Sequence, residues 1–197
     1  MPKRDAVIIA GIDGSATSEH ALRWAESHAR LTGAALHVVL SRNPDSDVRL
    51  SLAKQDRFPG VPALRDAADE ELSRKLLSEY INHVLPKDST VAVGVEVRYG
   101  AAAKSLIEAG FAHAADLIVV GRRGLGAWSS VLLGSVSDQV AVHAGRPVAV
   151  IGENAGSATS APIVIVGVDG SSGSTEAASW AATAAKSYGA RLEVVTA

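Results

Sequence analysis

The chain contains no cysteine among its 197 residues, which excludes disulfide bonds, thiolate metal sites and cysteine nucleophiles. Aromatic residues make up only 4% of the sequence, so a core must be built mainly from alanine, valine, leucine and isoleucine. The hydrophobic fraction of 47% is nevertheless that of a globular protein. Small aliphatic side chains of this kind suit helices that pack closely on a parallel sheet.

The chain also lacks an excess of either charge and any long apolar run. Nineteen basic residues against 21 acidic ones give a net charge of −2, so attraction to nucleic acid or to an anionic membrane is not expected. No segment has the roughly 20 apolar residues that span a bilayer. The apolar run Ala6 to Ile12 is interrupted by Asp13, which favours a buried first strand over a secretory leader. We therefore expect a cytoplasmic protein whose anion site, if any, is local.

Short apolar runs alternate with segments of helical periodicity. This alternation predicts an α/β fold with a doubly wound, five-stranded parallel sheet and right-handed crossovers. In the second expected helix, Leu72, Leu76 and Tyr80 lie in an apolar row at fourfold spacing, which we assign to the core. The expected strands are 6–12, 34–40, 91–98, 116–120 and 147–151, and the expected helices are 16–31, 62–84, 101–113 and 136–144.

An internal repeat begins after a segment rich in Asn, Gly, Ser, Thr and Ala. The offset of 156 residues that relates Asp13 to Asp169 aligns the following residues without a gap. A β-α-β fragment of about 35 residues buries little apolar surface, so this second copy should need a partner surface. We predict a domain at 1–152, a linker at 153–162 and a partial second repeat at 163–197.

The most informative motif follows the fourth expected strand. Gly121-Arg122-Arg123-Gly124 is followed, after nine further residues, by Gly134-Ser135-Val136-Ser137. Glycines here, including Gly126, let the backbone approach a ligand and leave amides free to face an oxyanion. Ser135 and Asp138 have capping-box spacing, so a helix from about residue 136 should direct its first amides toward the loop. The motif predicts a phosphate site, although glycine clusters after strands also serve as simple turns.

This G-x2-G-x9-G-[S/T] spacing resembles the ATP-binding signature of the universal stress proteins. The resemblance extends to Val7-Ile-Ile-Ala-Gly-Ile-Asp13-Gly-Ser15, to Tyr99-Gly100 and to Gly145-Arg-Pro-Val-Ala-Val150. It implies an adenine nucleotide alpha hydrolase-like fold with strand order 3-2-1-4-5. It also implies membership of the ATP-binding subgroup, a tandem arrangement with an incomplete second repeat, and a homodimer formed through the fifth strand.

The same resemblance implies where an adenine nucleotide would lie. Gly11 and Asp13 would border the adenine and ribose, Ser41 would contribute a backbone contact to the adenine, and the glycine motif would surround the phosphates. Taken alone, Asp13 also fits an Asx-turn or helix-cap acceptor, and Arg122 and Arg123 also fit solvated loop residues. The candidate ligand-binding residues are Gly11, Asp13, Ser41, Gly121, Arg122, Arg123, Gly124, Gly126, Gly134, Ser135, Val136 and Ser137.

Motifs for other chemistry are missing from the sequence. There is no G-x-x-x-x-G-K-[S/T] loop, no complete dinucleotide fingerprint, no H-E-x-x-H pair and no G-x-S-x-G elbow. We therefore expect an ATP-binding stress-response or regulatory protein with no assigned catalytic residue and at most weak ATP hydrolysis. Any metal would be Mg²⁺ that arrives with the ATP phosphates. A slow ATPase or phosphotransferase and a nucleotide-free interaction module are the alternatives.

Overall fold

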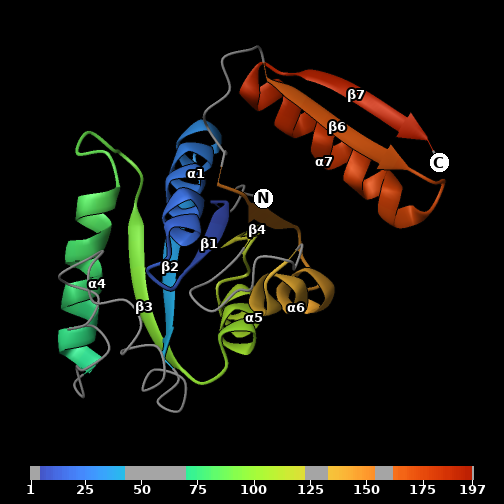
Figure 1. Ribbon diagram of the computed structural model, residues 1–197. Coiled ribbons are helices and arrows are strands. Elements are labelled where there is room, and N and C mark those ends of the chain that lie inside the picture. The colour runs from blue at the N-terminus through green and yellow to red at the C-terminus, as the bar shows by residue number, and fades with distance from the viewer. Residues whose placement is uncertain (1–4, 43–69, 123–132, 154–161, 197) are drawn as a thin grey trace. The chain divides into compact units, whose positions relative to one another are not determined.

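The computed structural model describes residues 5–42, 70–122, 133–153 and 162–196, and it divides into unit 1, Met1–Ala155, and unit 2, Gly156–Ala197. Unit 1 holds a five-stranded parallel sheet in the order β3-β2-β1-β4-β5 (Figure 1), which confirms the predicted fold class and strand order. Its strands are β1 (Val7–Ile12), β2 (Ala35–Arg42), β3 (Val93–Tyr99), β4 (Leu117–Gly121) and β5 (Val148–Ile151). Its described helices are α1 (Ala16–Thr32), α4 (Glu70–Val84), α5 (Ala102–Ala112) and α6 (Ser135–His143).

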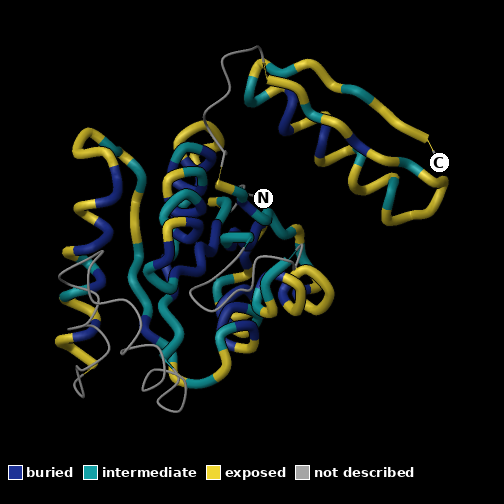
Figure 2. Tube along the Cα trace, viewed as in Figure 1, coloured by how far each residue is buried: buried dark blue, intermediate teal, exposed yellow. Residues whose placement is uncertain are grey.

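Helices cover both faces of this sheet, so the central strands are apolar on both sides. Residues of α1 and α4 share one hydrophobic cluster with Leu36 and Val38 of β2, and residues of α5 and α6 share a second cluster with Ile9 and Ile118. β1 and β4 are buried along most of their length and β2 in part, and the helices that pack on the sheet carry dark blue segments in the burial view (Figure 2). This two-layered core fixes the strand ends at which a site can form.

The ends of α1 follow from its sequence. The Ser15 side chain accepts a hydrogen bond from the Ser18 amide at the N-cap, and Gly33 adopts φ +71° at the C-cap. The apolar row that we predicted for α4 is partly wrong, because Leu72 is 45% exposed. Residues at fourfold spacing advance by about 40° per step around a helix, so a long row leaves the core. The buried apolar face is Leu77, Tyr80, Ile81 and Val84.

Unit 2 contains β6 (Ile163–Val168), α7 (Ser172–Tyr188) and β7 (Arg191–Thr196), with its two strands paired in parallel. The ends of β6 and α7 lie 156 positions after those of β1 and α1. This confirms the predicted partial second β-α-β fragment. Its buried apolar residues are Val166 and, on α7, Ala181, Ala184 and Ala185. Ile165 and Val194 are exposed, and most of the tube of this unit is yellow or teal (Figure 2).

Candidate nucleotide-binding site

The carboxyl ends of three adjacent strands bring several predicted site residues to one edge of the sheet. Asp13 follows β1, Ser41 lies near the end of β2, and Gly121 ends β4, with β1 placed between β2 and β4. Ligands of open α/β sheets bind at this edge, beside the point where the strand order reverses. The topology thus places residues far apart in sequence at the location that the glycine motif predicts.

Asp13 takes part in the turn that leads from β1 into α1. Its Oδ1 atom accepts a hydrogen bond from the Ser15 amide at 2.9 Å, and Gly14 has φ +79°. This is the Asx-turn that Asp13 also fits in the sequence, and it prepares Ser15 to cap α1. Burial, with Glu19 and Asp13 nearby, raises the pKa of Tyr80 on α4 well above its ordinary value of 10.0. Tyr80 is therefore a neutral phenol next to this turn.

Two glycines of the predicted site admit protein atoms at the points where a side chain would stand. A Cβ atom on Gly11 would lie 2.7 Å from Cδ1 of Leu106 on α5. A Cβ atom on Gly121 would lie 2.8 Å from the backbone carbon of Thr17 and 2.9 Å from its carbonyl oxygen. Gly121 therefore lets the first turn of α1 approach the end of β4. Close packing explains both glycines without a ligand.

Side-chain hydrogen bonds hold the end of β2 on both faces of the sheet. Ser41 Oγ donates to the Gly100 carbonyl oxygen at 2.9 Å and lies 3.1 Å from the Ser105 hydroxyl of α5. On the other side, Arg42 Nη1 donates to Ser73 Oγ of α4 at 2.9 Å, and Ser73 is fully buried. Sequence reasoning missed Arg42, Ser73 and Ser105. A basic residue at the end of an apolar strand was the available signal for Arg42.

The two ends of the glycine motif meet each other in the structure. The Gly134 amide donates to the Arg122 carbonyl oxygen at 2.8 Å, and Ser137 Oγ lies 3.1 Å from that same oxygen. The Arg122 amide in turn donates to the Ile151 carbonyl oxygen at 2.8 Å, which ties the motif to β5. The loop is therefore closed at its base, and the Gly134 amide already has a protein acceptor. Arg123, Gly124 and Gly126 lie outside the described residues.

The predicted cap of α6 is wrong in its position. Gly134, with φ −74° and ψ 158°, is the N-cap, and Ser135 is the first helical residue. Because Gly134 carries no side chain, no side-chain hydrogen bond caps α6. The first three amides of a helix have no acceptor within the helix, so those of Ser135, Val136 and Ser137 have none within α6. The N-termini of α1 and α7, by contrast, are capped by Ser15 and Ser171.

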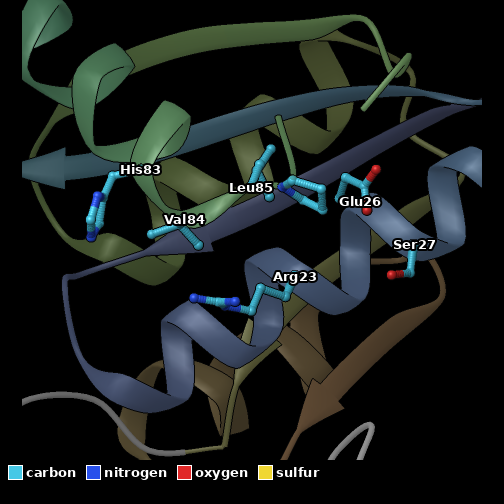
Figure 3. Close-up of a pocket in the computed structure, with 7 residues that line it drawn as sticks. Arg23, Glu26, Ser27, His83, Val84 and Leu85 are labelled. Carbon is cyan, nitrogen blue, oxygen red and sulfur yellow. The ribbon is translucent and has the colours of Figure 1, made fainter. Parts of the chain in front are cut away.

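A pocket of about 310 Å³ lies elsewhere, between α1 and the C-terminal end of α4 (Figure 3). Glu26 in this pocket is 1% exposed and accepts a hydrogen bond from Ser89 Oγ at 2.7 Å, while Arg23 pairs with Glu19 at 2.6 Å. These charged groups are thus engaged within the protein. The pocket is lined by Arg23, Glu26, Ser27, His83, Val84, Leu85 and Pro86, none of which is a predicted site residue.

Within the described ranges, no group of three or more His, Asp or Glu side chains is arranged to hold a metal ion. Among the helices of the same ranges, none is long and apolar enough to cross a membrane.

The family model of the universal stress protein family matches residues 6–152 and 162–197. The chain belongs to the universal stress protein family. A universal stress protein of Mycolicibacterium smegmatis is 32% identical over 194 residues, which are 94% of this chain and 61% of that protein. One from Thermus aquaticus is 31% identical over 147 residues, 73% of this chain and 96% of that protein. The chain thus spans less than two thirds of the length of the Mycolicibacterium smegmatis protein.

Solved structures of universal stress proteins share this fold at low sequence identity. One from Archaeoglobus fulgidus DSM 4304 is 18% identical, with a TM-score of 0.67 over 98% of this chain and 68% of that chain. A universal stress protein in complex with cAMP is 21% identical, with a TM-score of 0.51 over 77% of this chain and 99% of that one. A third, from Archaeoglobus fulgidus in complex with dAMP, is 19% identical, with a TM-score of 0.50 over 75% and 98% of the two chains.

Proposed function

We propose that this universal stress protein binds ATP at the carboxyl edge of the unit 1 sheet and acts as a nucleotide-dependent regulator. The start of α6 carries the proposal, because its N-cap, Gly134, supplies no side-chain acceptor to the first amides of the helix. Helix starts of this kind favour phosphate through their amides and their positive dipole end. Adenine nucleotides in two structures of the same fold, cAMP in one and dAMP in the other, support the choice of ligand.

The proposed contacts divide by chemistry. Gly11, Asp13 and Ser41 would border the adenosine. Arg122 and Arg123 would add positive charge at the phosphates, and Mg²⁺ would enter with them. The phosphate contacts are assigned to the remaining motif residues Gly121, Gly124, Gly126, Gly134, Ser135, Val136 and Ser137, with the Gly134 amide itself serving the loop closure rather than the ligand.

We propose binding with little turnover. Hydrolysis needs a positioned base for the attacking water, and Asp13, a carboxylate at this edge, has its Oδ1 atom in the Asx-turn. We further propose a cytoplasmic homodimer through β5, an edge strand of the sheet, and a tandem relationship between the two units. A slow ATPase is the second candidate, and measurable ADP production would favour it.

The site is tested by a variant that removes one amide and leaves the helix intact. Proline is tolerated at the first helical position, and the preceding Gly134 already has the extended backbone that proline requires. Ser135→Pro should therefore keep α6 and weaken ATP binding about tenfold or more, the usual effect of losing a hydrogen bond to a charged group. Isothermal titration calorimetry with ATP and Mg²⁺ measures this change.

The matched control is Ala16→Pro at the first position of α1, whose N-cap Ser15 has φ −76° and ψ 158°. It should leave ATP affinity unchanged. Mass spectrometry of ligand released from the denatured parent protein, followed by an ADP assay, separates binding from turnover. A parent protein that does not bind ATP, or equal affinity in Ser135→Pro and the parent, would overturn the proposal.

A further inference from the structure

Five ionisable side chains gather where the C-terminal end of α5 meets β2 and β3. His113 Nε2 lies 3.0 Å from Glu96 Oε2, and the other oxygen of Glu96 accepts a hydrogen bond from Arg98 Nε at 2.8 Å. Arg98 Nη1 in turn lies 3.6 Å from Glu108 Oε2. All of these side chains are at least partly exposed, and the fifth is His37 of β2. The cluster lies outside the candidate nucleotide site.

The His37 ring is held between a strand and a second ring. Its centroid lies 4.2 Å from that of His113, with an angle of 32° between the ring planes. Beneath it, β3 has Gly94 opposite His37, and a Cβ atom there would lie only 2.6 Å from His37 Nδ1. The glycine thus makes room for the imidazole. Two titratable rings are kept in contact by the backbone on one side and by the end of α5 on the other.

The charges around the two rings are unequal. Glu96 contacts His113, which stands at the C-terminal end of α5, whereas His37 lies on β2. Burial, and after it the charge of His113, lower the pKa of His37 from its ordinary value of 6.5, with Glu96 acting in the opposite direction. Arg98 is occupied by the two carboxylates, and Ile9 of β1, the other strand neighbour of His37, is apolar. Protonation of His37 next to a charged His113 is therefore unfavourable.

We propose that His37 and His113 form an acid-sensitive latch that fastens the C-terminal end of α5 to the sheet at neutral pH and loosens when His37 is protonated in acid. Proton linkage gives the direction of the pH effect. A histidine whose pKa is lower in the folded chain binds its proton more readily in the open chain, so the open population increases as pH falls below about 6.5. The latch is closed above that value and weakens below it.

Helix α5 also contacts the candidate nucleotide site through its first turns. Ser105 lies 3.1 Å from Ser41 Oγ, and Leu106 fills the space over Gly11. One consequence rests on the proposed function: loosening of α5 would lower the affinity of the protein for ATP in acid. The latch itself depends only on the histidine pair and its neighbours.

Hydrogen exchange of α5 in the full chain, compared at pH 7.5 and pH 5.5 and corrected for intrinsic exchange rates, tests the latch. At pH 5.5, one unit below the ordinary histidine pKa of 6.5, a ring that binds its proton only on opening raises the open population at most about tenfold, so we expect up to about a tenfold loss of α5 protection in acid. His37→Gln should reduce this loss to less than about twofold. Glu96→Gln, which removes the compensating charge, should increase it. The control His83→Gln, at an exposed position of α4, should behave as the parent.

Equal acid sensitivity in the parent and His37→Gln would overturn the latch. Nuclear magnetic resonance titration of the imidazole rings in the parent protein gives a second test that needs no variant, and a His37 midpoint at or above 6.5 would also overturn it. ATP affinity at both pH values is measured in parallel. Absence of ATP binding at pH 7.5 would refute the proposed function and leave the exchange result to decide the latch.

Discussion

Units 1 and 2 contain the same local structure with different surroundings. Helices α1 and α7 both begin after a serine whose side chain accepts an amide hydrogen bond, and both end at a glycine with positive φ. The equivalent strand positions differ sharply, because Ile9 is 0% exposed and Ile165 is 64% exposed. The same caps and turns therefore set the ends of the helices in both units. Burial of the strand side chains depends instead on the neighbouring strands and helices that unit 1 supplies.

The largest expected effect contrasts these two isoleucines. Ile9→Ala removes buried methyl groups from the α5 side of the sheet and should lower the free energy of unfolding by about 3 kcal/mol. Ile165→Ala, at the equivalent position of β6, should change it by at most about 0.5 kcal/mol. Urea unfolding followed by far-ultraviolet circular dichroism measures both. A similarly large loss for Ile165→Ala would show that the exposed face of β6 is covered in solution.

A smaller contrast concerns two equivalent glycines. Gly11→Ala would force Leu106 to move and should cost about 1 to 2 kcal/mol, whereas a Cβ atom on Gly167 meets nothing within 4 Å. Gly167→Ala should therefore be neutral or stabilise by about 0.5 kcal/mol. The same unfolding measurement applies. Adding Leu106→Ala should remove most of the extra cost of Gly11→Ala, and additive losses would contradict the packing explanation.

Much of the fold was predictable because its signals are local. Apolar runs marked all five strands of unit 1, Gly33 marked the end of α1, and the gapless offset predicted unit 2. The strand order was implied only by the family resemblance, since no local signal decides which strands become neighbours. Leu72 was misplaced because the direction of a helix face depends on the packing partner, which a row of equally spaced residues does not specify.

The site was predicted less completely than the fold. The sequence indicated the loop and the helix after it, but placed the cap at Ser135 instead of Gly134, because serine is the commoner cap. It also assigned Gly11 and Gly121 to a ligand, and it did not reveal that both accommodate neighbouring protein atoms as well. His37 and His113 lie far apart in the chain without a spacing motif, so only the folded structure reveals their contact.

The smallest effect tests whether the local turn of unit 2 persists without the packing of unit 1. Asp169 is fully exposed and accepts hydrogen bonds from Ser171. The bond from the Ser171 side chain has the larger effect and the bond from its amide the next, and together they lower the pKa of Asp169 from 3.8 to about 2. Because the folded pKa is depressed, this stabilisation is present above about pH 4 and is lost as pH falls toward 2. Carboxyl carbon titration by nuclear magnetic resonance should give a midpoint near 2 for Asp169, and Ser171→Ala should return it toward 3.8. A midpoint near 3.8 in the parent would mean that the turn is not formed in solution, and that the capped start of α7 depends on the neighbours that unit 2 lacks.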